Sequence, residues 1–188
     1  MLLAVTGLNG SGKDAVANYL KEKHGFTHIS LSNLVVDLVK EAGLDPSDRD
    51  NLNKIADQKR KELGPDFLAK KALENYYSEE KLVLSSFRHP KEIEAVKQYG
   101  GIITRVDVNL ETRFKRTKKR KELDENDYGS VTIEDFKLKE KRELSNPDKD
   151  KMQILKVLDR AEVVFQNNET LDELHKQIDE FVKKLLIS

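Results

Sequence analysis

Cysteine is absent from this chain of 188 residues. Disulfide bonds and thiolate metal sites within the chain are therefore excluded. The histidines lack the spacing of metal ligands, so neither zinc binding nor redox chemistry is expected; they are His24, His28, His89 and His175.

An excess of charge is also lacking, because 34 lysine and arginine residues balance 34 aspartate and glutamate residues. This balance argues against a general binder of nucleic acid or of a membrane surface. No apolar run approaches the length that spans a bilayer, and an expected first strand from Leu2 leaves no room for a signal peptide. We therefore expect a cytoplasmic protein, with neither a membrane nor nucleic acid as its partner.

What the sequence does contain is a glycine-rich loop after the apolar run 2–6. The loop follows the spacing G-x-x-x-x-G-K-[ST] of a Walker A motif except at its last position; it consists of Gly7, Leu8, Asn9, Gly10, Ser11, Gly12, Lys13 and Asp14. A turn that leaves a strand and opens a helix directs several backbone N–H groups at one point, where the helix dipole adds positive charge. We therefore expect these residues to bind the phosphates of ATP, with Lys13 reaching the β and γ phosphates.

Asp14 stands where the motif has a hydroxyl that helps to hold Mg²⁺. A carboxylate adds negative charge beside the phosphates, so we expect Asp14 to bind Mg²⁺ through a water molecule. The alternative is that Asp14 mainly stabilises the first turn of the following helix, as an acidic residue at the positive end of the dipole.

Short apolar runs alternate with helical patterns along the whole chain, without repeats or a linker. This alternation indicates a single α/β domain, residues 1–188, with a mainly parallel sheet. The expected strands are 2–6, 26–30, 81–85, 102–108 and 162–165. Helical patterns over 34–43, 46–63 and 65–77 exceed what a simple crossover needs, and Pro46 and Pro65 fit first helical positions. Residues 32–78 are therefore a candidate acceptor-binding insertion.

A strongly basic stretch begins on a helix near Leu110 and is followed by an acidic run. We interpret residues 111–145 as a lid, some of whose arginines close over the phosphates; the candidates are Arg113, Arg116 and Arg120. Two alternatives stay open at this point, a solvated helix surface and an RNA-binding stripe. Aromatic residues are sparse here and the acidic run would repel a nucleic-acid backbone, which favours the lid.

Further candidates follow the expected strands. Arg88 lies just past the third strand, at the sheet edge where open parallel sheets bind ligands. Asn167, after the fifth strand, either approaches an adenine base or belongs to a polar turn. The positive charge that binds the phosphate of an acceptor could come from Arg49 or Arg60. The interpretation of these two arginines as solvent-exposed charges on a helix surface is at least as good.

Along nearly its whole length the chain resembles the P-loop nucleotide kinases of the nucleoside monophosphate kinase superfamily. The dephospho-CoA kinase-like predicted nucleotide kinases and the phage-type deoxynucleoside monophosphate kinases are the most similar in pattern. The resemblance rests on Gly12-Lys13-Asp14, on 82–94, on 111–116, on 161–168, and on Arg60 with Gly64-Pro65. It implies a three-layer α/β fold, in which a five-stranded parallel sheet has helices on both faces, an acceptor-binding insertion and a lid.

The resemblance also implies an activity, the transfer of the γ-phosphoryl group of Mg-ATP to a small-molecule nucleotide acceptor. That acceptor would be a nucleoside or deoxynucleoside monophosphate, or a compound like dephospho-CoA. The implied catalytic residues are Lys13, Arg88 and Arg116. Arg113 and Asn167 would bind ATP together with the glycine-rich loop, and the acceptor would contact Ser32, Arg60 and Arg88.

The chain departs from this pattern at two positions. Ser85-Ser86 stands where many relatives have an acidic residue, and Val36 stands where adenylate kinases have an arginine. An ordinary adenylate kinase is therefore disfavoured, and a second hypothesis is an ATP-binding switch whose readout is a partner protein or RNA. The sequence leaves open whether the protein is a monomer or a homodimer.

Overall fold

The computed structural model describes residues 1–123, 132–144, 148 and 151–187. Five parallel strands form one sheet in the order β2-β3-β1-β4-β5. The strands are β1 (Leu2–Gly7), β2 (Thr27–Ser30), β3 (Leu82–Ser85), β4 (Ile102–Asp107) and β5 (Val163–Gln166). The expected five-stranded α/β fold is thereby confirmed.

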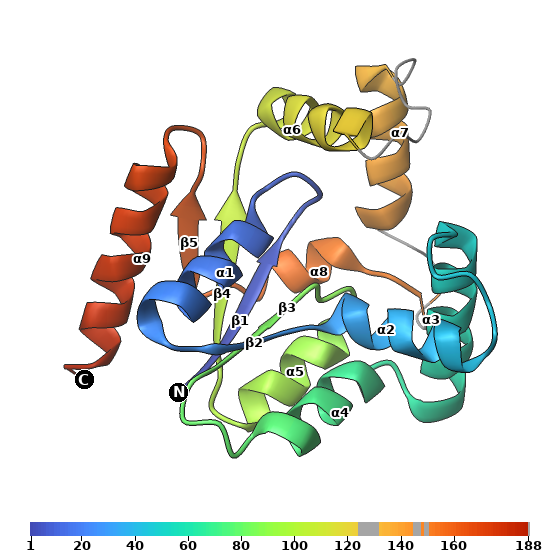
Figure 1. Ribbon diagram of the computed structural model, residues 1–188, viewed down its shortest axis with the longest axis horizontal. Coiled ribbons are helices and arrows are strands. Elements are labelled where there is room, and N and C mark those ends of the chain that lie inside the picture. The colour runs from blue at the N-terminus through green and yellow to red at the C-terminus, as the bar shows by residue number, and fades with distance from the viewer. Residues whose placement is uncertain (124–131, 145–147, 149–150, 188) are drawn as a thin grey trace.

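Helices cover both faces of this sheet (Figure 1). They are α1 (Lys13–His24), α2 (Leu31–Glu41), α3 (Arg49–Leu63), α4 (Phe67–Tyr76), α5 (Pro90–Gln98), α6 (Leu110–Leu123), α7 (Ile133–Leu144), α8 (Ile154–Leu158) and α9 (Leu171–Leu185). One apolar core lies between the sheet and α1 with α9, and the other lies between the sheet and α2, α3, α4, α5 and α8. Within the described residues, no helix combines the length and the apolar character that a membrane crossing requires.

The central strand β1 places the glycine-rich loop. Leu3, Ala4 and Val5 are fully buried because helices pack on both faces of the sheet, which is why this strand reads as an unbroken apolar run. β1 pairs with β3 on one side and with β4 on the other, so the chain crosses in opposite directions from it. Such a switch point opens a crevice at the carboxyl ends of the strands, and the loop leaves β1 there.

The helices between β2 and β3 begin at different residues from those expected. α2 begins at Leu31, so Ser32 and Val36 lie in its first two turns. Pro46 and Pro65 precede α3 and α4 instead of occupying their first positions, since Asp48 and Asp66 are the residues that flank these helices. The side chain of Asp48 accepts a hydrogen bond from the Asp50 N–H at 2.8 Å, and this cap fixes the start of α3 beyond the proline.

The region expected to form a lid contains α6 and α7, which stand at the loop end of the sheet (Figure 1). Residues 124–131 and 145 of this region lie outside the described residues, as do the side chains of Arg49 and Arg120. The rings of Phe114 and Phe136 lie 5.7 Å apart and join the two helices.

Candidate active site

The glycine-rich loop adopts a conformation that requires its glycines. Gly10 and Gly12 have φ values of 78° and 93°, in the left-handed region that favours glycine. Gly12 precedes α1 without a side-chain cap, and Lys13 is the first residue of the helix. The N–H groups of the first turn and the positive end of the dipole therefore face the crevice, as an anion site requires.

α6 packs directly against the tip of the loop. A Cβ atom added to Gly10 would lie 2.6 Å from the carbonyl oxygen of Arg113 and 2.8 Å from the Oγ1 atom of Thr117. Backbone of α6 therefore touches the loop, and only a glycine fits between them.

We expect Gly10→Ala to weaken ATP binding by about tenfold or more, because the left-handed φ costs about 1–2 kcal/mol and the methyl group also pushes α6 away. Gly43→Ala is the matched control, since Gly43 has a φ of 70° but no atom within 4 Å of an added Cβ. Calorimetric titration with ATP and thermal unfolding of both variants check this expectation. Equal nucleotide affinities in the two variants would contradict it.

Asn167 and Arg116 approach the loop from the other side. The Nδ2 of Asn167 donates to the carbonyl oxygen of Ser11 at 2.7 Å. The backbone N–H of Asn167 donates to the carbonyl oxygen of Asp107 at 2.8 Å. The guanidinium of Arg116 donates in turn to the carbonyl oxygen of Asn167 at 3.1 Å. The structure thus brings these two predicted site residues together at the loop.

Polar groups without partners surround the same turn. The NH1 of Arg116, the Oγ1 of Thr117 and the Oγ of Ser11 are buried and have no hydrogen-bond partner among the described residues. A cavity of about 220 Å³, the loop cavity, is lined by Gly10, Gly12, Lys13, Asp14, Arg116 and Thr117. Buried donors are normally satisfied, so Arg116 and Thr117, which line this cavity, are suited to hydrogen-bond the oxygen atoms of an anion.

Arg113 makes a different set of contacts from those the resemblance implies. Its guanidinium pairs with the carboxylate of Glu140 on α7, and its Nε donates to the carbonyl oxygen of Val108 at 3.3 Å. The same group lies 5.7 Å from the ring centre of Phe136. In this conformation Arg113 ties α6 to α7, and its expected contact with ATP stays a prediction.

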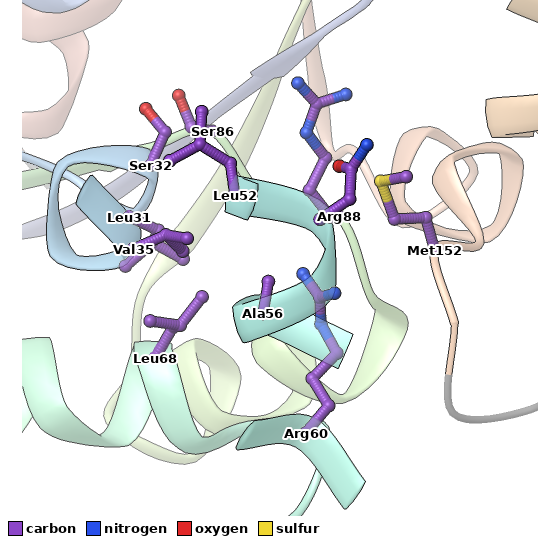
Figure 2. A pocket seen from close by; sticks show the side chains of 11 residues that line it. Leu31, Ser32, Val35, Leu52, Ala56, Arg60, Leu68, Ser86, Arg88 and Met152 are labelled. Carbon is purple, nitrogen blue, oxygen red and sulfur yellow. The ribbon is translucent and has the colours of Figure 1, made fainter. Parts of the chain in front are cut away.

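A second cavity lies among the helices between β2 and β3 (Figure 2). This helix-lined cavity measures about 120 Å³ and is bounded by Leu31, Ser32, Val35, Leu52, Asn53, Ala56, Arg60, Leu68, Ser86, Arg88 and Met152. Figure 2 shows apolar side chains of α2 and α4 on one side, with Arg60 and Arg88 on the other. The three predicted acceptor residues, Ser32, Arg60 and Arg88, therefore line one cavity.

Arg60 and Arg88 are held in different ways. Arg60 is 4% exposed; its NH1 pairs with Asp57 at 3.0 Å, and its Nε has no partner among the described residues. The backbone of Arg88 is fixed at both ends, because its N–H donates to Glu92 and its carbonyl oxygen accepts from the Gln153 N–H. The interpretation of Arg60 as an exposed surface charge is therefore wrong.

Glu92 is the buried group that fixes the loop after β3. It is fully buried, and its Oε2 accepts the backbone N–H groups of Arg88 at 2.7 Å and His89 at 3.0 Å. Burial raises the pKa of Glu92, while the charge of Arg60 opposes this shift. The carboxyl therefore contributes stability that is fully present below its unfolded-state pKa and is lost as the pH rises through the raised folded-state pKa.

We expect Glu92→Ala to lower the free energy of unfolding by about 2 kcal/mol or more, because two buried N–H groups lose their acceptor. Glu92→Gln keeps an acceptor oxygen, so it should lose less and should lack the decline at high pH. Denaturant unfolding across a pH series, with Glu94→Ala as the control at a partly exposed glutamate of the same helix, measures both effects. A Glu92→Ala variant as stable as the control would contradict this role.

A central cleft joins the two ends of the site. It measures about 360 Å³ and is lined by Asn9, Lys13, Asp14, His28, Ser30, Ser32, Asn33, Ser86 and Arg88. Ser32, Ser86 and Arg88 also line the helix-lined cavity, while Lys13 and Asp14 also line the loop cavity. The central cleft therefore adjoins the glycine-rich loop on one side and the helix-lined cavity on the other.

Hydroxyl groups gather at the ends of β2 and β3. Ser86 is the non-glycine residue that has a positive φ, 69°, among the described residues. Its Oγ accepts a hydrogen bond from the Oγ of Ser30 at 3.0 Å. The Oγ atoms of Ser30 and Ser32 lie 2.8 Å apart. A left-handed serine is strained, and such strain concentrates at functional sites. The sequence singled out Ser86 only as part of Ser85-Ser86, in place of an acidic residue, and it named no role for Ser30.

Asp14 contributes the carboxylate of the central cleft. Its side chain is 54% exposed, and its Oδ2 lies 3.7 Å from the Nζ of Lys13. Among the described residues no group of three or more metal-ligating side chains occurs. One carboxylate beside an anion site fits Mg²⁺, which keeps several waters and takes its other ligands from phosphates.

Comparison with known proteins identifies the architecture. The model of a family described as an AAA domain matches residues 3–137. A UPF0200 protein of Sulfurisphaera tokodaii is 28% identical over 187 residues, covering 98% of this chain and 97% of that one. A UPF0200 protein of Pyrobaculum aerophilum is 27% identical over 187 residues, covering 98% of each chain.

Solved structures of kinases share the fold. The shikimate kinase of Acinetobacter baumannii, in complex with shikimate, superposes with a TM-score of 0.59 at 17% identity and covers 98% of this chain and 92% of its own. A gluconokinase of Sinorhizobium meliloti gives a TM-score of 0.55 at 15% identity, and the match covers 98% of this chain and 95% of the gluconokinase chain. The chain therefore has the P-loop kinase fold.

Proposed function

Since the chain belongs to the AAA domain family, we propose that it is a phosphotransferase that moves the γ-phosphoryl group of ATP to a small-molecule acceptor. The observation that carries this proposal is that the central cleft shares lining residues with both the loop cavity and the helix-lined cavity. Lys13 of the glycine-rich loop and Arg88 of the helix-lined cavity line the same central cleft. A donor at the loop and an acceptor in the cavity would thus meet between two cationic side chains.

The residues present fit the demands of phosphoryl transfer, which depends on positioning and on neutralising charge around the γ-phosphate. Lys13, Arg116 and the loop N–H groups would hold ATP, and Arg88 would contact the acceptor or the transferring group. Asp14 would hold Mg²⁺ through a water, and the bound ion would supply charge neutralisation. Closure of α6 and α7 would exclude water from the cleft.

The acceptor that we propose is a nucleotide-like compound, namely a nucleoside monophosphate, a deoxynucleoside monophosphate or a compound like dephospho-CoA. The helix-lined cavity supports such a ligand because it combines an apolar wall with Arg60 and Arg88. The shikimate and gluconate of the structurally similar kinases add two further candidates. Mixed apolar and cationic linings suit a ligand whose body is apolar and whose substituents are anionic.

ADP formation with Mg²⁺ and each candidate acceptor, against a blank without acceptor, tests this proposal. We expect one class of acceptor to raise the rate at least tenfold above the blank. If ATP binds and no acceptor changes the rate, the phosphotransferase proposal fails.

The alternative function is an ATP-binding switch that acts through a protein or RNA partner. The hydroxyl groups of Ser85 and Ser86 favour it, since neither can serve as a strong base or a charged metal ligand. Slow ATP hydrolysis that a partner stimulates, without phosphorylation of any acceptor, would select this alternative.

A further inference from the structure

His28 is a half-buried histidine in the central cleft that the functions described above leave without a role. It lies on β2, two residues before Ser30, so the alternation of the strand directs both side chains to the same face. Its Nε2 lies 2.9 Å from the Oγ of Ser85 on the neighbouring strand. It lines the cleft together with Lys13, Asp14 and Arg88.

The hydrogen bond to Ser85 orients the imidazole ring. The Oγ of Ser85 belongs to a fully buried residue of β3. When Nε2–H donates to this oxygen, the tautomer that results carries its lone pair on Nδ1. Ser85 is in this way a positioning residue, because its hydroxyl holds the ring in place and, when it accepts from Nε2–H, leaves Nδ1 able to accept a proton.

The charged groups around His28 come from α1 and from the cleft walls. Asp14 and Lys21 of α1 act on it in opposite directions, and Lys13 and Arg88 line the same cleft. Burial is the largest influence and lowers the pKa of His28 below its ordinary value, with Lys21 adding to the fall and Asp14 opposing it. A neutral imidazole at pH 7 is available as a proton acceptor.

We propose that the attacking group of the acceptor is a hydroxyl, and that His28 takes the proton which this hydroxyl loses. This inference rests on the proposed phosphotransferase function and specifies its acceptor. A new bond forms between the acceptor oxygen and the γ-phosphorus, and the bond from that phosphorus to the β-bridging oxygen breaks. The electron pair leaves with ADP, and the hydroxyl proton moves to Nδ1 of His28.

Acceptors that react through a phosphate and acceptors that react through a hydroxyl differ in whether they need a base. The phosphate oxygen of a nucleoside monophosphate is already ionised at pH 7, so its attack requires no base. A hydroxyl must lose its proton in the transfer, and a positioned base accelerates that step. Ser30, Ser32 and Ser86 surround the cleft with neutral hydroxyl groups, which can hydrogen-bond an alcohol without repelling ATP.

The first arm of the test compares acceptors with the wild-type protein. Dephospho-CoA, shikimate, gluconate and deoxynucleosides present a hydroxyl as the reacting group, whereas nucleoside monophosphates offer a phosphate. We expect ATP turnover with a hydroxyl acceptor. Turnover with monophosphates alone would overturn the assignment of His28 and leave the phosphotransferase function standing, while turnover with neither class would overturn that function itself.

The second arm uses His28→Gln, which keeps a group able to donate to Ser85, and His175→Gln as a matched control on α9. With the hydroxyl acceptor, kcat of His28→Gln should fall by about 10²–10⁴-fold, while ATP affinity changes by less than threefold. The wild-type kcat should decline as the pH falls through the lowered pKa of His28, and this acid limb should vanish in His28→Gln alone. A kcat within twofold of the control, or an unchanged acid limb, would refute the role of His28.

Discussion

Replacing Lys13 with alanine should reduce ATP turnover by at least about 100-fold while the protein stays folded. Lys13 opens α1 and lines both the loop cavity and the central cleft, with its side chain 13% exposed. Its ammonium group is the charge that would neutralise the transferring phosphoryl group, and losing one such group costs about 10²–10³-fold in rate. Little stability should be lost, since no apolar core includes this side chain.

Two further variants separate charge from packing at this position. Lys13→Met keeps the aliphatic stem and removes the ammonium group, so its turnover should fall as far as that of Lys13→Ala. Lys91→Ala removes an exposed lysine of α5 and should leave turnover unchanged. Circular dichroism and thermal unfolding would check that each variant is folded. Normal turnover in a folded Lys13→Ala sample would refute the assignment of the loop to ATP.

Replacing Arg88 with alanine should impair use of the acceptor by about 10²–10³-fold in kcat/KM and leave ATP affinity within about threefold. The side chain of Arg88 lines both the central cleft and the helix-lined cavity, where a donor and an acceptor would meet. The substitution preserves its backbone bonds to Glu92 and Gln153, so the loop after β3 should keep its conformation.

Arg160→Ala is the matched control for Arg88, because Arg160 is a 52% exposed arginine whose partner is Glu94 on the surface. Steady-state kinetics with varied acceptor, together with calorimetric titration by ATP, measure the two quantities separately. Equal losses of acceptor use and of ATP affinity would place Arg88 at the donor instead.

The parts of the site that the sequence predicts are those fixed by backbone geometry. Gly10 and Gly12 are recognisable because their φ values and the close approach of α6 and Asn167 tolerate no side chain. Arg88 is predictable because parallel strands end at one edge of the sheet. In both cases a local pattern determines where the residue lies.

The contacts that the sequence did not predict depend on pairing between distant segments. His28 reaches Ser85 because β2 pairs with β3 in a register that places Ser30 opposite Ser85. The spacing of His28 and Ser30 at the end of one strand could have suggested that both side chains face the same side. It could not show which strand pairs with β2, and so it could not predict the contact with Ser85. Arg113 likewise looked like other lid arginines, and only the packing of α7 shows that it pairs with Glu140.

The position of α6 has a consequence for nucleotide binding. Its backbone touches Gly10, and Arg116 reaches across to Asn167, so α6 already rests on the loop in this conformation. The phosphates of ATP would meet the unpartnered Arg116 NH1 and Thr117 Oγ1 there. Binding would thus satisfy groups that have no hydrogen-bond partner among the described residues, which favours an anion in this cavity.

The measurement that tests phosphoryl transfer most directly follows the γ-phosphorus of labelled ATP. The protein is incubated with Mg²⁺, labelled ATP and each acceptor, with Lys13→Ala as the inactive control, and the products are separated. We expect the label to appear in one organic phosphate ester that forms only when its acceptor is present and never with Lys13→Ala. Label recovered solely as inorganic phosphate, at a rate that no acceptor changes, would contradict a phosphotransferase and favour the ATP-binding switch.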